Sequence, residues 1–141
     1  EKIHLGPKDK KGYGGLNYRF PTRQATVVTS PDGPQKTSDL KRYPWVDFSG
    51  QFEDAPARSG ILFMVHPQNI DPNPGWTLRC EDDYGYIGVS WPGLDGFDFE
   101  PGQTYTNRFR LWLHRGDATH FDPQALFAAY AQTPTVRVVN K

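Results

Sequence analysis

The chain has 141 residues, and its 16 Lys and Arg balance 16 Asp and Glu, so the formal net charge is zero. This length fits one compact domain covering residues 1–141. The charge balance leaves no basic surplus for phosphates, which argues against a nucleic-acid partner. The longest apolar run, residues 61–65, is far too short to span a bilayer, so no membrane partner is expected either.

Glycine and proline, at 14 and 13 residues, accompany an aromatic content of 14%, which indicates many turns between short strands rather than disorder. Cys80 is the only cysteine, so no intrachain disulfide can form. Cysteine usage therefore does not indicate in which cellular compartment the protein works. The chain begins at Glu1 rather than Met, from which we expect a removed leader or an expressed piece of a longer protein. A secreted or periplasmic location is favoured.

Short apolar or alternating segments, separated by Gly, Pro, Asn and Asp, predict strands along the whole chain. Residues 1–12 are expected to form a flexible arm. Long loops are expected at 33–42, 67–75 and 92–102, and an acidic turn at 81–83. The run at 61–66 is nearly all apolar and predicts a strand covered on both faces. The other predicted strands are 16–20, 24–29, 45–48, 76–80, 84–91, 104–114 and 135–139.

One helix is predicted, beginning after Asp122 and ending near residue 131. Asp122 is a typical N-cap residue, and Pro123 suits the first turn. Leu126, Phe127 and Tyr130 are spaced to form one apolar face. The fold class is therefore all-β: an antiparallel β-sandwich, of jelly-roll type or half of a mutarotase-like fold, with one short C-terminal helix.

The segment 104–114 alternates strictly, and a strand sends alternate side chains to opposite faces. One parity is expected to face the core, namely Tyr105, Asn107, Phe109, Leu111 and Leu113. The other parity carries Arg108, Arg110, Trp112 and His114, which suit sugars and carboxylates as planar donors beside an aromatic ring. The competing reading is a solvated outer face, whose arginines need carboxylates nearby, with Asp47 or Asp117 available to provide them.

Four further residues are candidates for catalysis or binding. His66 ends an apolar strand and enters a Pro-rich loop, where it is either an acid/base or a histidine bonded to loop backbone. Arg79 and Tyr84 flank the acidic turn, where Arg79 either clamps a carboxylate or pairs with an acid of that turn. Trp91, like Trp112, is a candidate ring-stacking platform. The predicted catalytic residues are thus His66, Arg79 and His114.

A metal site is a weaker possibility. Copper or zinc would accept imidazole, and His66, His114 and His120 are the histidines available outside the arm. No His-x-His or His-x3-His pair occurs, and the chain has no Gly-x-Ser-x-Gly nucleophile elbow. The sequence therefore predicts no assured cofactor, and a divalent metal such as copper or zinc is a possible one.

Six segments occur in an order that resembles a known family. They are Gly-Tyr-Gly-Gly-Leu-Asn-Tyr-Arg-Phe at 12–20, Trp-Val-Asp-Phe-Ser-Gly at 45–50, His-Pro-Gln-Asn at 66–69, Trp-Thr-Leu-Arg-Cys-Glu-Asp-Asp-Tyr-Gly at 76–85, the stretch at 100–118, and Ala-Leu-Phe-Ala-Ala-Tyr-Ala at 125–131. Together they resemble the C-terminal half of the DUF6807 family. The resemblance implies a bacterial β-sandwich protein associated with carbohydrate breakdown.

Two departures from the family pattern bear on function. Family members are about twice this length, and the His-Pro-His-His-like motif of their N-terminal half is missing here. The family's usual Asp-His-Pro is Val65-His66-Pro67 in this chain, so an acid before that histidine is lost. If the family chemistry needs those groups, a second chain supplies them or this chain only binds.

The sequence therefore predicts a carbohydrate-active protein acting on polysaccharide or oligosaccharide fragments, with hydrolysis, elimination and metal-assisted oxidation all open. In this reading Arg108, Arg110, Trp112, Trp91 and Tyr84 bind the substrate. Two alternatives remain: a non-catalytic glycan-binding module, and a structural half-domain that a homodimer or a second chain completes.

Overall fold

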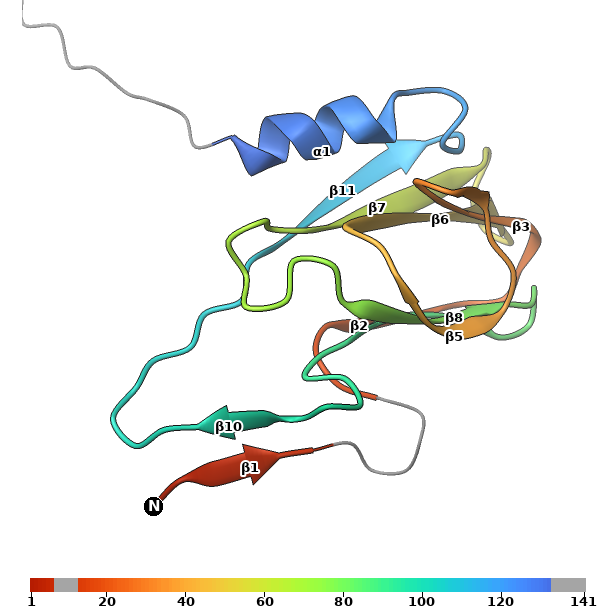
Figure 1. The fold of residues 1–141 in the computed structure, drawn as a ribbon. Coiled ribbons are helices and arrows are strands. Elements are labelled where there is room, and N and C mark those ends of the chain that lie inside the picture. Colours follow the sequence, from red (N-terminus) through yellow and green to blue (C-terminus); the bar gives the residue numbers. More distant parts are fainter. Residues whose placement is uncertain (7–12, 133–141) are drawn as a thin grey trace, which may run out of the picture.

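The computed structural model describes residues 1–6 and 13–132 of the chain. Two antiparallel sheets face each other, and one helix, α1 (Pro123–Ala131), lies on the far side of the larger sheet (Figure 1). The β-sandwich with one short helix that the sequence predicts is confirmed.

The larger sheet has five strands in the spatial order β11-β7-β6-β3-β4, and all neighbours are antiparallel. Its strands are β3 (Arg23–Ser30), β4 (Gly33–Pro34), β6 (Trp45–Phe52), β7 (Ser59–Val65) and β11 (Phe109–Arg115). Alternate residues of β7 pack against the second sheet and against α1. Both faces of β7 are therefore covered, which is why its sequence is apolar almost throughout.

The smaller sheet has the spatial order β2-β9-β8-β5. Its strands are β2 (Asn17–Phe20), β5 (Ser38–Arg42), β8 (Gly75–Cys80) and β9 (Gly85–Ser90). The acidic turn joins β8 to β9 as predicted, and the backbone N–H of Tyr84 donates to the carbonyl of Glu81 at 3.2 Å. The carboxylate of Asp82 accepts hydrogen bonds from the N–H and the hydroxyl of Thr26, so this turn also ties the two sheets together.

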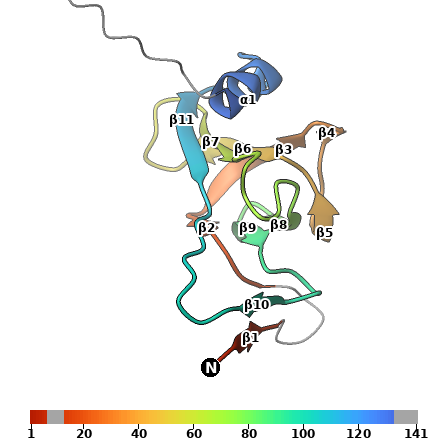
Figure 2. The ribbon, with the colours of Figure 1, turned by 60° about the vertical axis from the view of Figure 1, so that its left-hand side comes forward.

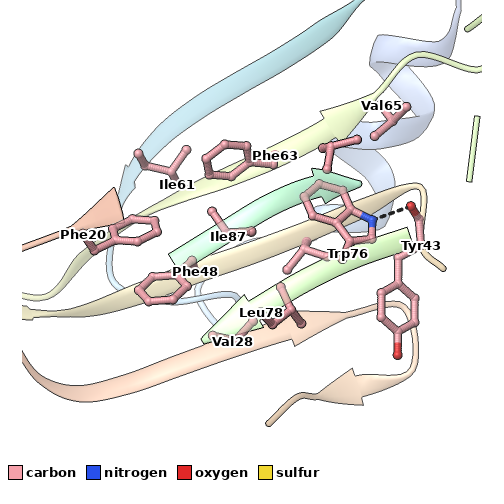
Figure 3. Packing of buried hydrophobic residues seen from close by; sticks show 12 residues of the cluster. Phe20, Val28, Tyr43, Phe48, Ile61, Phe63, Val65, Trp76, Leu78 and Ile87 are labelled. Carbon is pink, nitrogen blue, oxygen red and sulfur yellow. Dashed lines mark hydrogen bonds between the residues drawn. The ribbon is translucent and has the colours of Figure 1, made fainter. Parts of the chain in front are cut away.

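The hydrophobic core fills the space between the two sheets (Figure 3). Trp76 is fully buried in it, and its indole N–H donates to the backbone carbonyl of Tyr43 at 2.8 Å. The rings of Phe20 and Phe48 stack across the sheets with their centroids 3.7 Å apart. The buried residues of this core are Phe20, Val28, Tyr43, Val46, Phe48, Ile61, Phe63, Val65, Trp76, Leu78, Ile87 and Val89.

Helix α1 forms a third layer over the outer face of the larger sheet (Figure 1). It begins as predicted, because the carboxylate of Asp122 accepts a hydrogen bond from the N–H of Ala125 at 3.0 Å. Its apolar side covers a second cluster, built on Trp45, Leu62 and Met64. In the described residues no helix is long and apolar enough to cross a membrane.

Two segments that were predicted as loops contain strands. Residues 33–42 include β4 and β5, and residues 92–102 include β10 (Phe97–Phe99), which pairs with β1 (Ile3–Leu5). These strands are short and lie at sheet edges or in a two-stranded ribbon, so they show little of the apolar pattern that marks a buried strand. The rest of the predicted arm, 7–12, and the predicted strand 135–139 lie outside the described residues.

Strand β11 is shorter than the predicted strand 104–114, and the predicted covering of its two faces is wrong at its C-terminal end. Phe109 packs on the core as expected, but Leu111 and Leu113 are 42% and 72% exposed. Trp112 instead packs under Phe121, and the side chain of His114 is buried. The alternation is as predicted, but α1 and the segment before it cover the part of the arginine-bearing face that holds Trp112 and His114.

Candidate functional site

The turn after β7 contains His66 and fixes the start of β11. The backbone N–H of His66 donates to the carbonyl of Arg108 at 3.1 Å, which extends the pairing of β7 with β11. The N–H of Asn69 donates to the carbonyl of His66 at 3.0 Å and closes the turn. The His-Pro-Gln-Asn segment therefore sets where Arg108 and the residues after it enter the strand.

Asn69 completes this arrangement with its side chain. Its amide nitrogen donates to the carbonyl of Arg108 at 2.9 Å, and its amide oxygen accepts from the N–H of Arg108 at 2.8 Å. The side chain thus behaves like one more residue of a neighbouring strand. Asn69 itself is buried, at 6% exposure, so its amide is held in place by these two bonds.

Replacing Asn69 by alanine is expected to lower the free energy of unfolding by about 1–3 kcal/mol, because the N–H of Arg108 loses its partner and the carbonyl of Arg108 keeps only the N–H of His66. Urea denaturation measures this change. Asn73→Ala is the matched control, since the side chain of Asn73 is exposed in the same loop, and it should change stability by less than about 0.5 kcal/mol. Equal stability of both variants would contradict the positioning of Arg108 by Asn69.

A cationic cluster forms beside this turn, and we define it as His66, Arg108, Arg110 and Tyr130. The ring of Tyr130, on α1, meets the edge of the His66 ring with centroids 5.0 Å apart. The guanidinium of Arg110 lies 4.5 Å from the centroid of the Tyr130 ring. Burial raises the pKa of Tyr130, while Arg110 and Arg108 oppose that rise. The hydroxyl therefore remains a hydrogen-bond donor near neutral pH.

The orientation of the His66 ring determines what it can offer a ligand. Its Nδ1 accepts a hydrogen bond from the backbone N–H of Gln68 at 3.1 Å. A neutral imidazole has one donor and one acceptor nitrogen, so the proton of neutral His66 is on Nε2. Neutral His66, which is 8% exposed, therefore has a donor and not a base at Nε2.

The two arginines of the cluster keep their charge available. Both are exposed, and among residues 1–6 and 13–132 neither forms an ion pair. The carboxylates that the sequence suggested as partners are engaged elsewhere: Asp47 bonds to His114, and Asp117 lies 3.6 Å from Arg58. The suggestion that these two acids neutralise the arginines is therefore wrong.

His114 lies at the far end of β11 from the cationic cluster. Its Nε2 donates to the carboxylate of Asp47 at 2.6 Å, and the two side chains are only 3% and 0% exposed. Burial raises the pKa of Asp47, and the hydrogen bond from His114 opposes that rise. The other carboxylate oxygen of Asp47 has no partner among the described residues. This buried pair lies under the ring of Phe121 and is shielded from a ligand in solution.

The three histidines considered for a metal do not come together. His66 follows Val65, which pairs with Phe109, and His114 lies at the other end of β11, about 17 Å away at roughly 3.4 Å per residue. His120 is exposed and bonds to Asp117 at 3.2 Å. Within the described ranges no group of three or more His, Cys, Asp or Glu side chains could hold a metal ion. One ion cannot bind both His66 and His114.

Arg79 lies in β8 of the smaller sheet and Tyr84 in the turn between β8 and β9, far from the cationic cluster. Arg79 pairs with Asp39 at 2.8 Å and also donates to the carbonyl of Leu78, so its guanidinium is already occupied. The alternative that Arg79 pairs with an acid of the 81–83 turn is therefore wrong, because its partner is Asp39. Tyr84 is 42% exposed, and the guanidinium of Arg19 lies 5.2 Å from its ring centroid.

The two tryptophans proposed as platforms are both partly buried. Trp112 packs under Phe121, with ring centroids 4.6 Å apart, and covers the second apolar cluster. Trp91 packs against Phe97 and lines an open groove of about 390 Å³ together with Tyr13 and other residues. Trp91 therefore has one face near solvent, whereas Trp112 packs against the second apolar cluster.

Sequence reasoning brought His66, Arg108 and Arg110 into consideration, and the structure places them together. It missed Tyr130 and Asn69 as members of this site. Tyr130 had been assigned only to the apolar face of the helix, and its position over the sheet is a tertiary feature. Asn69 did carry a signal, because it ends the His-Pro-Gln-Asn segment.

A β-sandwich with an exposed cationic cluster does not define a single activity. Comparison with known proteins identifies a family, but one whose function is unknown. The model of a family of unknown function, DUF6807, matches residues 1–128. The chain therefore belongs to the DUF6807 family, as its six segments predicted. No curated protein and no solved structure matches the chain.

Proposed function

We propose that this protein is carbohydrate-active and binds an acidic saccharide, such as a uronic acid, at the cationic cluster. The observation that carries the proposal is that Arg108 and Arg110 are exposed and form no ion pair in the described part of the chain. A guanidinium binds a carboxylate through two parallel hydrogen bonds, which gives both affinity and orientation.

The neighbours of the arginines support a sugar rather than a simple anion. Nε2 of His66 and the hydroxyl of Tyr130 add neutral donors of the kind that ring hydroxyls accept. Both belong to rigid elements, since His66 is held by its turn and Tyr130 by α1. A site that is already ordered loses little entropy when the ligand binds.

The same geometry favours binding over catalysis. Neutral His66 has its proton on Nε2 and cannot act there as a base, Arg79 is paired, and His114 is buried with Asp47. General base catalysis needs an acceptor nitrogen or oxygen within reach of the reacting atom. The proposal therefore assigns a ligand class and leaves the reaction unassigned.

Titration calorimetry with oligogalacturonate tests the proposal, with a neutral galactose oligomer of equal length as the ligand control. The double variant Arg108→Gln/Arg110→Gln should weaken binding of the acidic oligomer by at least about 100-fold, since it removes two charged donors and each charged hydrogen bond contributes roughly 1.5–3 kcal/mol. Arg19→Gln is the matched control, because Arg19 is equally an exposed arginine stacked on tyrosine, but on the other sheet. Unchanged binding in the double variant, or equal binding of the neutral oligomer, would reject the proposal.

A further inference from the structure

Strand β11 forms an open edge of the larger sheet (Figure 2). It pairs with β7 on one side, and no described strand lies on the other. The backbone N–H and C=O of Arg108 bond toward the β7 side, and the N–H of Gly116 donates to Arg58 on that side at 2.8 Å. The backbone N–H and C=O groups of an antiparallel strand point alternately to one side and the other. Between Arg108 and Gly116, the residues whose backbone groups point to the open side are therefore Phe109, Leu111, Leu113 and Arg115.

Three of these four side chains, those of Phe109, Leu111 and Leu113, are apolar. Leu111 and Leu113 are 42% and 72% exposed, although they share a face with Phe109, which packs on the core. Tyr18, on the facing edge strand β2, is 41% exposed. An open hollow of about 270 Å³ lies between these edges and is lined by Tyr18, Ile61 and Leu113 among others.

Other edges of the two sheets carry the features that usually prevent pairing between molecules. Strand β4 is two residues long and ends in Pro34. Strand β5 is interrupted by a register shift between Asp39 and Lys41. Strand β2 has only four residues. Strand β11 has seven residues with no proline and no register shift, so it is the least protected edge among the described strands.

We propose that β11 pairs antiparallel with β11 of a second copy of this chain, so that the two larger sheets form one continuous sheet. A twofold axis at Trp112 places Leu111 opposite Leu113 of the partner copy, and Phe109 opposite its Arg115. In this register every outward-pointing residue faces another outward-pointing residue, so all the open backbone groups of the strand are paired. The same patch serves both copies, as a twofold dimer requires.

The charges of the chain agree with a second copy as the occupant. The formal net charge is zero, so two copies do not repel each other as a whole. The arginines of β11 are Arg110 and Arg115. In this register Arg115 faces Phe109 of the partner copy and Arg110 faces its His114, so no arginine lies directly opposite another arginine. The exposed leucines lie opposite each other, which removes their apolar surface from water.

Sedimentation velocity tests the association. The chain is expected to be a dimer at about 10–100 µM, a range in which a specific interface of ordinary size is populated. Leu111→Lys should raise the dimer dissociation constant at least tenfold while leaving the thermal midpoint of the fold nearly unchanged. Leu94→Lys is the matched control, because Leu94 is 46% exposed but lies in a distant loop, and it should remain a dimer.

Cysteine cross-linking tests the register, in a Cys80→Ser background. Leu111→Cys and Leu113→Cys chains, mixed and oxidised, should form a disulfide-linked dimer, because paired Cα atoms lie about 5.5 Å apart. Each variant alone should link much less, since identical positions would lie beyond roughly 7 Å. A monomeric wild type, a dimer that Leu111→Lys leaves intact, or equal cross-linking within each single variant would overturn the proposal.

Discussion

Replacing His114 by alanine is expected to lower the free energy of unfolding by about 3–5 kcal/mol, among the largest effects of any single substitution in this chain. The reason is the partner that remains: Asp47 is 0% exposed, and one of its oxygens already lacks a partner among the described residues. Without His114 the carboxylate must either stay charged without a partner or take up a proton. Urea denaturation, followed by far-UV circular dichroism, measures the loss.

A double-mutant cycle shows whether the pair itself causes the loss. Asp47→Ala removes the buried charge, so His114→Ala should cost clearly less in that background than in the wild type. Asp47→Asn keeps the shape and an acceptor oxygen for Nε2 of His114, and it should be the mildest of the three changes. Equal costs of His114→Ala in both backgrounds would mean that packing under Phe121, and not the hydrogen bond, matters.

The pH dependence gives an independent readout of the same pair. Burial raises the pKa of Asp47 above the ordinary 3.8, so its protonated form is favoured in the folded protein. Its contribution to stability is therefore complete below about pH 3.8 and is lost as the pH rises through the raised folded pKa. The wild type should accordingly gain stability relative to Asp47→Asn as the pH falls through that window. Carboxylates with a lowered pKa that do not interact with Asp47, such as Asp82, act alike in both proteins and cancel in the difference.

The strands and the helix were largely predictable because their signals are local. An apolar run marks β7, the acidic turn marks the β8–β9 hairpin, and Asp122 with Pro123 marks the start of α1. Each signal depends on residues that are neighbours in the chain. Strands β4, β5 and β10 lack such signals because they lie at edges, where few side chains need to be apolar.

The faces of β11 show where local patterns stop being informative. Alternation tells which side chains share a face, but not which face another element covers. Helix α1 covers Trp112, and Phe121 in the segment before it covers His114, whereas Leu113 on the other face stays in water. Arg23 is a second example: it is 1% exposed, bonds to the carbonyls of Pro21 and Glu81, and had no signal in the sequence.

The sequence also predicted only part of the candidate site. His66, Arg108 and Arg110 stood out by residue type, and the pairing of β7 with β11 brings them together. Arg79 and His114 stood out equally, but their charges are used by Asp39 and Asp47 within the fold. Only the partners of each side chain, which the sequence does not state, separate an available group from one already engaged.

Replacing Trp76 by alanine is the other large effect that we expect, at about 3–5 kcal/mol of unfolding free energy. The indole is 0% exposed between the two sheets, with its ring edge toward Phe63 at a centroid distance of 6.4 Å. Truncation leaves a cavity that strands on both sides cannot close, because their backbones are held by their own pairing. It also leaves the carbonyl of Tyr43 without its donor.

Trp76→Phe separates these two contributions, because phenylalanine keeps most of the ring volume and loses the indole N–H. We expect it to cost roughly 1–3 kcal/mol, clearly less than the alanine variant. Both values come from urea denaturation followed by far-UV circular dichroism, which does not depend on the tryptophan being removed. A loss below about 1 kcal/mol in Trp76→Ala would mean that the sheets close over the vacated space, and the core would then be less rigid than its packing implies.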